Sequence, residues 1–140
     1  MKKIKYTILL VLITLSITGC FGMKSDGVLT ATCERTEVGY TMEEKTTYQI
    51  TYKEGDITNI LLSKSYVVED GNLTNSLISY QYAYEKSDGV RISVDNETNT
   101  ITYNFDMTKL ASDAIKKTFN LKTTYNEQIK TLKDIGFTCE

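Results

Sequence analysis

The sequence predicts an α+β domain in which a five-stranded, mainly antiparallel sheet carries two or three helices packed on one face. Five segments alternate apolar and polar residues, as half-buried strands do. Short loops rich in Gly, Asp and Asn join several of these segments, which favours antiparallel hairpins. Near the end of the chain the apolar spacing changes to three and four, which indicates helices. With 140 residues, 41% of them hydrophobic, the chain suffices for one domain and one core.

Three strands are expected at the start of the domain, over residues 28–36, 46–53 and 57–68. Gly39 marks the first connection, and Glu54-Gly55-Asp56 is a hairpin loop in which Gly55 takes a positive φ. Thr, Tyr, Ile and Val are frequent in all three segments, which suits a pleated surface. The residues expected to share one face within each strand are Leu29, Ala31 and Cys33, then Thr46, Tyr48, Ile50 and Tyr52, then Ile60, Leu62, Tyr66 and Val68.

The segment 73–86 fits two patterns. Its length and Asn72 at the cap position favour a helix, which would bury Tyr80 and Tyr84 in the core. A strand would instead align Tyr80, Tyr82 and Tyr84 on one face, as an aromatic surface on which a sugar or peptide could stack. Because aromatic stripes are usually core, the helix is the preferred interpretation.

A hairpin is expected over residues 90–105, with a polar loop at its tip. The loop places Asp95, Glu97 and Asn99 at alternate positions, as in a calcium-binding loop. Thr100 stands where such a loop requires glycine, and a strand follows where a helix should, so no metal site is expected. The two strands are expected at 90–94 and 101–105.

Two helices are expected after the hairpin. The first covers residues 107–119, and Asp106 can cap its start. The second begins at Thr124, which forms a capping box with Glu127 three residues later. Its apolar stripe consists of Tyr125, Ile129 and Leu132, Gly136 lies at the expected stop, and Phe137 can fold back on the last turn. The predicted order is therefore β-β-β-α-β-β-α-α.

The first twenty residues predict export. Lys2, Lys3 and Lys5 precede an apolar run of 12 residues, which is shorter than the about 20 residues that a membrane-spanning helix needs. The run ends in Ile17-Thr18-Gly19-Cys20, which resembles the lipobox of bacterial lipoproteins. The resemblance implies that Cys20 receives a diacylglyceryl group and becomes the mature N-terminus. The alternative is an ordinary signal peptide in which Cys20 is incidental.

This interpretation divides the chain into a signal peptide at 1–19, a lipidated cysteine with a short tether at 20–27, and a single domain at 28–140. Two or more acyl chains, such as palmitate, hold a protein stably on a membrane. The tether from Phe21 to Gly27 reaches roughly 23 Å when extended, at ~3.3 Å per residue. We therefore expect the domain to lie close to the extracytoplasmic face of the membrane.

Charge restricts the partners of the mature chain. Loss of the three signal lysines leaves 13 basic and 18 acidic residues, a net charge of −5. No basic cluster suited to a phosphate backbone is present, so nucleic acid is not an expected partner. No polybasic patch for anionic lipids is present either. Membrane attachment would rest on the acyl chains alone.

Cys33 and Cys139 remain once Cys20 is assigned to lipid. An even number of cysteines in an exported domain favours a structural disulfide, which would join the start of the domain to its end. Two free buried thiols and a redox pair are the alternatives. Redox pairs usually lie close together in sequence, as in Cys-X-X-Cys, and this pair does not.

No catalytic set is recognisable in the sequence. The chain has no histidine, which excludes a Ser-His-Asp or Cys-His centre and any zinc site that needs imidazole. The acidic pairs Glu43-Glu44 and Glu69-Asp70 are adjacent residues, which point to opposite faces of a strand. No phosphate-binding glycine loop is present. We expect no cofactor, no metal and no catalytic residues.

Most of the mature chain is similar to the small bacterial lipoproteins of the YehR type, a family of unknown function. The segments that carry the resemblance are Thr46-Thr47-Tyr48-Gln49-Ile50-Thr51-Tyr52, Gly89-Val90-Arg91-Ile92-Ser93-Val94, Thr100-Ile101-Thr102-Tyr103-Asn104-Phe105 and Leu132-Lys133-Asp134-Ile135-Gly136-Phe137. The resemblance implies an exported, anchored α+β domain.

Three hypotheses for the function follow. The first is a non-catalytic envelope lipoprotein that binds a protein or a small ligand. The second is an enzyme that uses carboxylates or tyrosines, and the third is a structural or stress-related envelope component.

Overall fold

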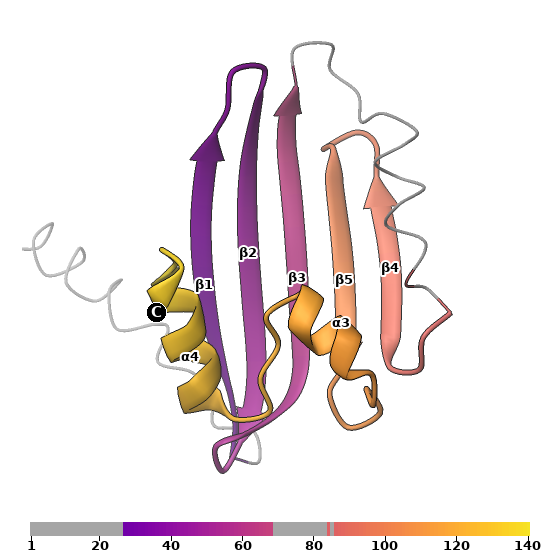
Figure 1. The fold of residues 1–140 in the computed structure, drawn as a ribbon, viewed down its shortest axis with the longest axis vertical. Helices are drawn as coiled ribbons and strands as arrows, with labels where there is room; N and C mark the ends of the chain where they lie inside the picture. Colours follow the sequence, from indigo (N-terminus) through magenta and orange to yellow (C-terminus); the bar gives the residue numbers. More distant parts are fainter. Residues whose placement is uncertain (1–26, 69–83, 85) are drawn as a thin grey trace, which may run out of the picture.

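The computed structural model describes residues 27–68, 84 and 86–140. One sheet of six strands has the order β4-β5-β3-β2-β1-β6, and each pair of neighbours is antiparallel (Figure 1). The elements are β1 Val28–Val38, β2 Met42–Lys53, β3 Asp56–Val68, β4 Val90–Asp95, β5 Thr100–Asp106, α3 Asp113–Thr118, α4 Tyr125–Asp134 and β6 Thr138–Cys139. The signal and lipobox residues lie outside the described part, as does the segment 73–86 apart from Tyr84 and Lys86.

The α+β class is confirmed, but the predicted count of five strands is wrong because β6 adds a sixth. This strand has two residues and pairs with Cys33 and Glu34 of β1. Two residues cannot display an alternating pattern, so no sequence signal marked it. The five predicted strands are present, and β2 begins four residues earlier than the alternation indicated.

The β2–β3 hairpin turns through two residues, Glu54 and Gly55, whose φ angles are 55° and 93°. Two-residue hairpin loops of this kind need positive φ at both positions, because only that backbone twist matches the twist of the strands. Glycine adopts such angles without steric cost. The expectation for Gly55 is thus confirmed.

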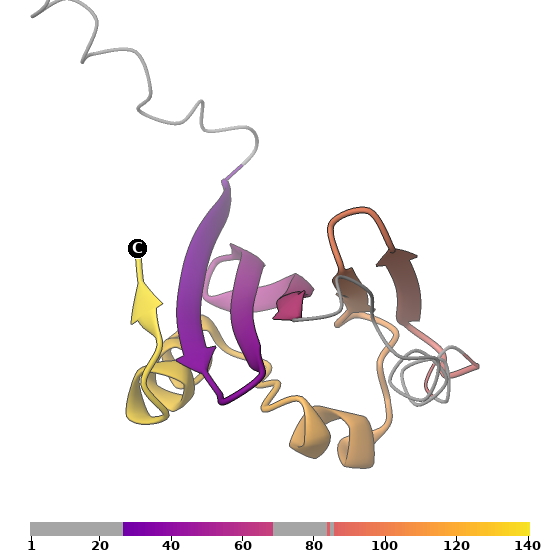
Figure 2. The ribbon, with the colours of Figure 1, turned by 90° about the horizontal axis from the view of Figure 1, so that it is seen from above.

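The covered face of the sheet holds the core. Both α3 and α4 lie on the same side of the sheet (Figure 2). Between helices and sheet, the described core includes residues that are completely buried, namely Cys33, Ile50, Ile60, Leu62, Ile101, Phe105 and Leu132. Phe119, just after α3, packs its ring against those of Tyr103 and Phe105 at centroid distances of 4.8 and 5.1 Å.

The opposite face of the sheet is polar. One row across it consists of Glu34, Thr47, Ser63, Thr102 and Ser93, each directly opposite the next. The hydroxyl oxygens of Ser63 and Thr102 lie 3.3 Å apart. An antiparallel sheet commonly exposes one such face to water, so this face needs no covering layer.

Helix α3 is shorter than predicted. The chain was expected to be helical over 107–119 with Asp106 as its cap, whereas Ser112 caps α3 and accepts a hydrogen bond from Ile115 N. Asp106 instead closes a turn, in which its carboxylate accepts from Thr108 N at 3.1 Å. The physical reason is that the start of this segment is hydrogen-bonded to the sheet, since Asp106 N donates to Gly89 O at 2.8 Å and Met107 N donates to Thr58 O at 3.0 Å.

Helix α4 begins after Thr124, as predicted, but the capping box is not formed. The Thr124 hydroxyl donates to the Glu127 carboxylate at 3.0 Å, and no side-chain oxygen caps the helix backbone. The predicted end is confirmed, since Gly136 has a φ of 93° and Phe137 N donates to Leu132 O at 3.0 Å. Within residues 27–68 and 86–140, no helix is long and apolar enough to cross a bilayer.

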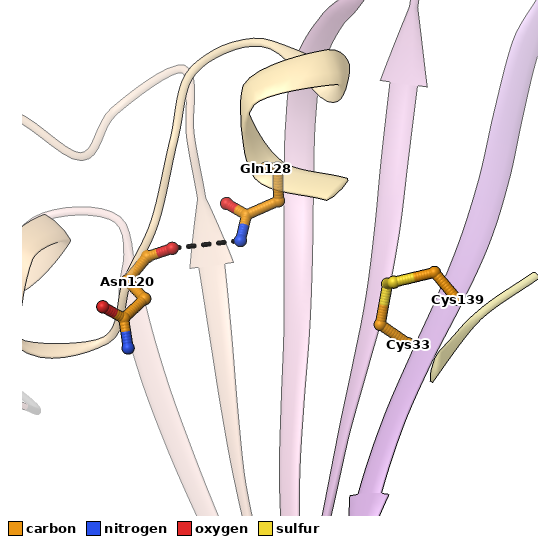
Figure 3. The surroundings of a disulfide bond; sticks show 4 residues. All are labelled: Cys33, Asn120, Gln128 and Cys139. Carbon is orange, nitrogen blue, oxygen red and sulfur yellow. Dashed lines mark hydrogen bonds between the residues drawn. A yellow bond between two sulfur atoms is a disulfide. The ribbon is translucent and has the colours of Figure 1, made fainter. Parts of the chain in front are cut away.

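Cys33 and Cys139 are directly opposite each other on β1 and β6, with Sγ atoms at a disulfide bond distance of 2.02 Å (Figure 3). Thr32 and Glu140 exchange both backbone hydrogen bonds, so the cysteines occupy the neighbouring non-hydrogen-bonded position. Opposite residues come closest at such positions, and here the Cα atoms are 4.0 Å apart. The bond therefore closes the C-terminal strand onto β1.

Replacing Gly89 by alanine should destabilise the domain strongly. The φ of +78° adds about 1 kcal/mol for an alanine. A Cβ would also lie 2.8 Å from Asp106 O and Leu110 N, which adds about 1–3 kcal/mol of overpacking. Gly55→Ala is the matched control, because its φ is also positive but no atom lies within 4 Å of the new Cβ. Equal losses in denaturant unfolding would contradict the close approach at Gly89.

Removing the disulfide should lower the free energy of unfolding. The bond joins residues 106 positions apart, and the chain-entropy model gives up to about 4–5 kcal/mol for a loop of that length. The double variant Cys33→Ala, Cys139→Ala, unfolded in urea beside the oxidised protein, measures this loss. A variant as stable as the oxidised protein would show that the bond does not constrain the unfolded chain.

Candidate functional site

The covered face changes from apolar to charged at one level of the sheet. Cys33, Tyr48 and Leu62 stand opposite one another on β1, β2 and β3 and are buried. One step further along the strands, the same face carries the row Arg35, Thr46 and Lys64. Figure 1 shows β1, β2 and β3 extending beyond both helices, so neither helix covers the whole length of these strands.

A cleft of about 230 Å³ opens beside this row. One wall is the sheet, and the other is formed by the residues at the C-terminal ends of α3 and α4. The lining residues are Arg35, Thr46, Tyr48, Leu62, Lys64, Tyr84, Tyr103, Thr118, Phe119, Asn120, Ile135 and Phe137. They include two cationic side chains and no acidic one, although the chain as a whole has a formal net charge of −2.

Arg35 is held in place by three contacts. Its Nη1 donates to the carbonyl of Ile135 at 2.7 Å, and its Nη2 donates to Glu37 Oε2 at 2.9 Å. The guanidinium carbon lies 4.8 Å from the ring centroid of Phe137, in a cation–π contact. Because Ile135 follows the last turn of α4, the cation also meets the negative end of the helix dipole. Arg35 thus presents a pre-oriented positive charge.

Lys64 is paired with Glu44 at 3.0 Å. Burial alone would raise the pKa of the Glu44 carboxyl, but hydrogen bonds from Lys64, Thr46 and Tyr66 outweigh it and lower the pKa below its usual value. Burial and the Glu44 charge raise the pKa of Tyr66, which stays a neutral donor. An ionised Glu44 therefore holds the Lys64 ammonium beside the cleft.

The loop after α3 forms the opposite lip of the cleft, and Gln128 of α4 holds it. Gln128 is completely buried. Its Oε1 accepts from Lys122 N at 2.7 Å, and its Nε2 donates to Asn120 O at 3.0 Å (Figure 3). Across the cleft, the Tyr48 hydroxyl donates to Phe119 O at 3.0 Å. The loop is therefore held at Phe119, Asn120 and Lys122 without any ligand.

The predicted aromatic surface lies mostly outside the described residues, which include Tyr84 but not Tyr80 or Tyr82. Tyr84 is half-buried and meets Phe119 edge-on at 5.2 Å between ring centroids. It therefore belongs to the wall of the cleft and the margin of the core rather than to an exposed platform.

In the loop whose spacing resembles a calcium-binding loop, the Asp95 carboxylate accepts hydrogen bonds from the loop backbone. Asp95 Oδ1 accepts from Glu97 N at 2.9 Å and from Thr98 N at 3.3 Å. Hydrogen bonds from Thr98 and Glu97 lower the pKa of the Asp95 carboxyl. The carboxylate closes the hairpin tip. Nowhere among residues 27–68, 84 and 86–140 do three or more acidic or cysteine side chains gather as a metal site would require.

Comparison with known proteins adds little to this description. No protein-family model matches the chain, and neither does any curated protein. Among solved structures, the chain is similar to an NMR structure of a protein from Streptococcus pneumoniae TIGR4, with 15% sequence identity and a TM-score of 0.49. The alignment covers 86% of this chain and 90% of that chain.

Alkaline pH should destabilise the domain through Tyr48. Burial raises the pKa of Tyr48 to about 12, whereas an unfolded tyrosine titrates near 10. The unfolded state therefore releases its proton first, so the contribution of Tyr48 to stability is constant below about pH 10 and falls as the pH rises towards 12, by at most about 1.4 kcal/mol per pH unit.

Denaturant unfolding at pH 9 and pH 11 tests this expectation. Tyr48→Phe should be less stable at pH 9, because Phe119 O loses its donor, and should lose less stability than the unsubstituted protein on going to pH 11. The matched control is Tyr40→Phe, which removes a hydroxyl from a fully exposed ring and should keep the original alkaline loss. An unchanged pH dependence in Tyr48→Phe would contradict the assignment.

Proposed function

We propose that this chain is a lipid-anchored binding protein of the bacterial cell envelope, related to the YehR-type lipoproteins, and that it binds a small ligand in the cleft beside Arg35 and Lys64. The observation that carries the proposal is the charged row placed on the covered face of the sheet. Folding alone would favour apolar side chains there, as in the row of Cys33, Tyr48 and Leu62.

Fixed lining groups support binding in particular. Ligand sites are usually concave, largely pre-formed, and lined by apolar and aromatic groups with a few oriented polar ones. The cleft combines the rings of Phe119 and Phe137 with cations that ion pairs already hold in position. Little side-chain entropy is then lost when a ligand binds.

A non-catalytic role is part of the proposal. None of the lining residues is a carboxylate, so the cleft has no paired acid and base of the kind that hydrolases use. The pKa shifts of Glu44, Asp95 and Asp106 are all downward, and these groups are ionised at neutral pH. Ionised carboxylates accept hydrogen bonds but cannot donate a proton to a substrate.

Two features support the envelope as the location. The lipobox Ile17-Thr18-Gly19-Cys20 provides the acylated residue, and β1 begins at Val28, directly after the short tether. The Cys33–Cys139 bond belongs to oxidising compartments, where disulfides persist. The partners of the protein are then the membrane, through its acyl chains, and a small ligand.

Cys20→Ser should release the protein from the membrane. Without the thiol no acyl chain can be attached, so the variant should move from the membrane pellet to the soluble fraction or remain as an unprocessed precursor. Lys24→Ala in the tether, which leaves residues 17–20 intact, is the matched control and should stay in the pellet. Mass spectrometry of the mature protein should show a start at Cys20 with acyl groups. An unmodified start would contradict the anchor.

A further inference from the structure

We infer that the cleft binds a small carboxylic acid with an apolar body, its carboxylate lying at Arg35 and Lys64. The inference rests on the proposed function and names the class of ligand. At about 230 Å³, the cleft is smaller than the ~300–1,000 Å³ typical of drug-sized ligands. It therefore suits a compact molecule rather than a glycan chain or a folded partner.

The hydrogen-bond donors in the cleft favour an anion. Five hydroxyl groups line it, those of Thr46, Tyr48, Tyr84, Tyr103 and Thr118. Three of them already donate within the protein: Thr46 to Glu44, Tyr48 to Phe119 O and Thr118 to Ala114 O. Their oxygens can accept hydrogen bonds, but their protons are engaged. Among the lining groups, only the nitrogens of Arg35 and Lys64 donate with a positive charge, and these are the donors that favour an anion.

Both cations keep hydrogens for a ligand. The contacts of Arg35 to Ile135 O and Glu37 use one hydrogen on each terminal nitrogen, and each of these nitrogens carries a second. Lys64 Nζ has three hydrogens, and its bond to Glu44 uses one. Hydrogen bonds from charged donors to a carboxylate are roughly twice as strong as neutral ones. These donors therefore select for negative charge.

The charge of the site favours one negative charge over two. Each cation is balanced by a neighbouring carboxylate, Glu37 beside Arg35 and Glu44 beside Lys64. The site is thus neutral as a whole, in a chain whose mature net charge would be −5. A phosphate dianion would meet two nearby carboxylates without a surplus of cations. A carboxylate carries a single negative charge and therefore needs less positive charge from the protein to balance it.

The remainder of the cleft receives the apolar part of the ligand. The lining also includes the rings of Tyr84 and Phe119, which meet edge-on, and that of Phe137 beneath the Arg35 guanidinium. Strands are about 4.8 Å apart, so the backbones of Arg35 and Lys64, two strands apart, lie about 10 Å from each other along the row, and the carboxylate would lie between their side chains. A ligand whose carboxylate lies there can place its apolar body against these rings.

The test compares matched small molecules on the full processed chain reconstituted in lipid nanodiscs, with binding followed by ligand-observed NMR. The probes are 3-phenylpropionate, the isosteric neutral 3-phenylpropionamide, and phenyl phosphate. The acid should bind at least about tenfold more tightly than the amide, a difference that corresponds to about 1.4 kcal/mol. Phenyl phosphate should bind more weakly than the acid.

Variants locate the binding and identify the charge. The double variant Glu44→Gln, Lys64→Gln removes both charges of the pair while retaining groups that can hydrogen-bond, and should weaken the acid about tenfold without weakening the amide. Arg91→Gln removes a cation from β4, outside the cleft, and is the matched control. Thr118→Trp fills the cleft from its rim and should abolish binding of every probe.

The outcomes separate the inference from the function on which it rests. Equal binding of acid and amide, both lost in Thr118→Trp, would overturn the carboxylate assignment and leave the binding cleft standing. Tighter binding of phenyl phosphate would likewise overturn it. Failure of all three probes to bind below 10 mM, or binding that Thr118→Trp leaves intact, would count against the cleft itself.

Discussion

Strand register connects the core of this protein to its candidate site. Every second residue of β1, β2 and β3 points towards the helices, and the antiparallel pairing aligns these residues into rows. The row of Cys33, Tyr48 and Leu62 and the row of Ala31, Ile50 and Ile60 are apolar and buried under the helices. The next row carries Arg35, Thr46 and Lys64, so the packing that holds the core also places the cations at one level. A shift of one residue in any strand would move its member of this row to the opposite face.

The groups that stabilise the fold are the same groups that hold the cleft open. Arg35 donates a hydrogen bond to the end of α4, and Tyr48 donates one to the loop after α3. Gln128 of α4 donates a further hydrogen bond to that loop. The Cys33–Cys139 bond fastens the chain that leaves α4 onto β1, one step from Arg35. Because each lip is held by a contact to the sheet or to the neighbouring helix, the cleft needs no ligand to take its shape.

Most of the fold could be predicted from the sequence, because alternation in residues 28–68 and 90–105 is strong and Gly55 and Gly136 mark real turns. The first helix was predicted to start too early, since the apolar spacing continues through Leu110 whereas Asp106 N and Met107 N are hydrogen-bonded to the sheet. Strand β6 depends on pairing between distant residues. The site was missed although its signal is present: Arg35 and Lys64 occupy positions where the alternation calls for apolar residues. Which rows face each other could not be known before the register.

Native mass spectrometry of the protein, produced in bacteria and isolated under gentle conditions, tests the binding role most directly. We expect a fraction of the molecules to carry a small acidic compound, and we expect this adduct to be absent from Thr118→Trp purified in the same way. Recovery of the unsubstituted and the Thr118→Trp proteins with the same small molecules, or with none, would contradict a ligand-binding cleft between the sheet and the ends of α3 and α4.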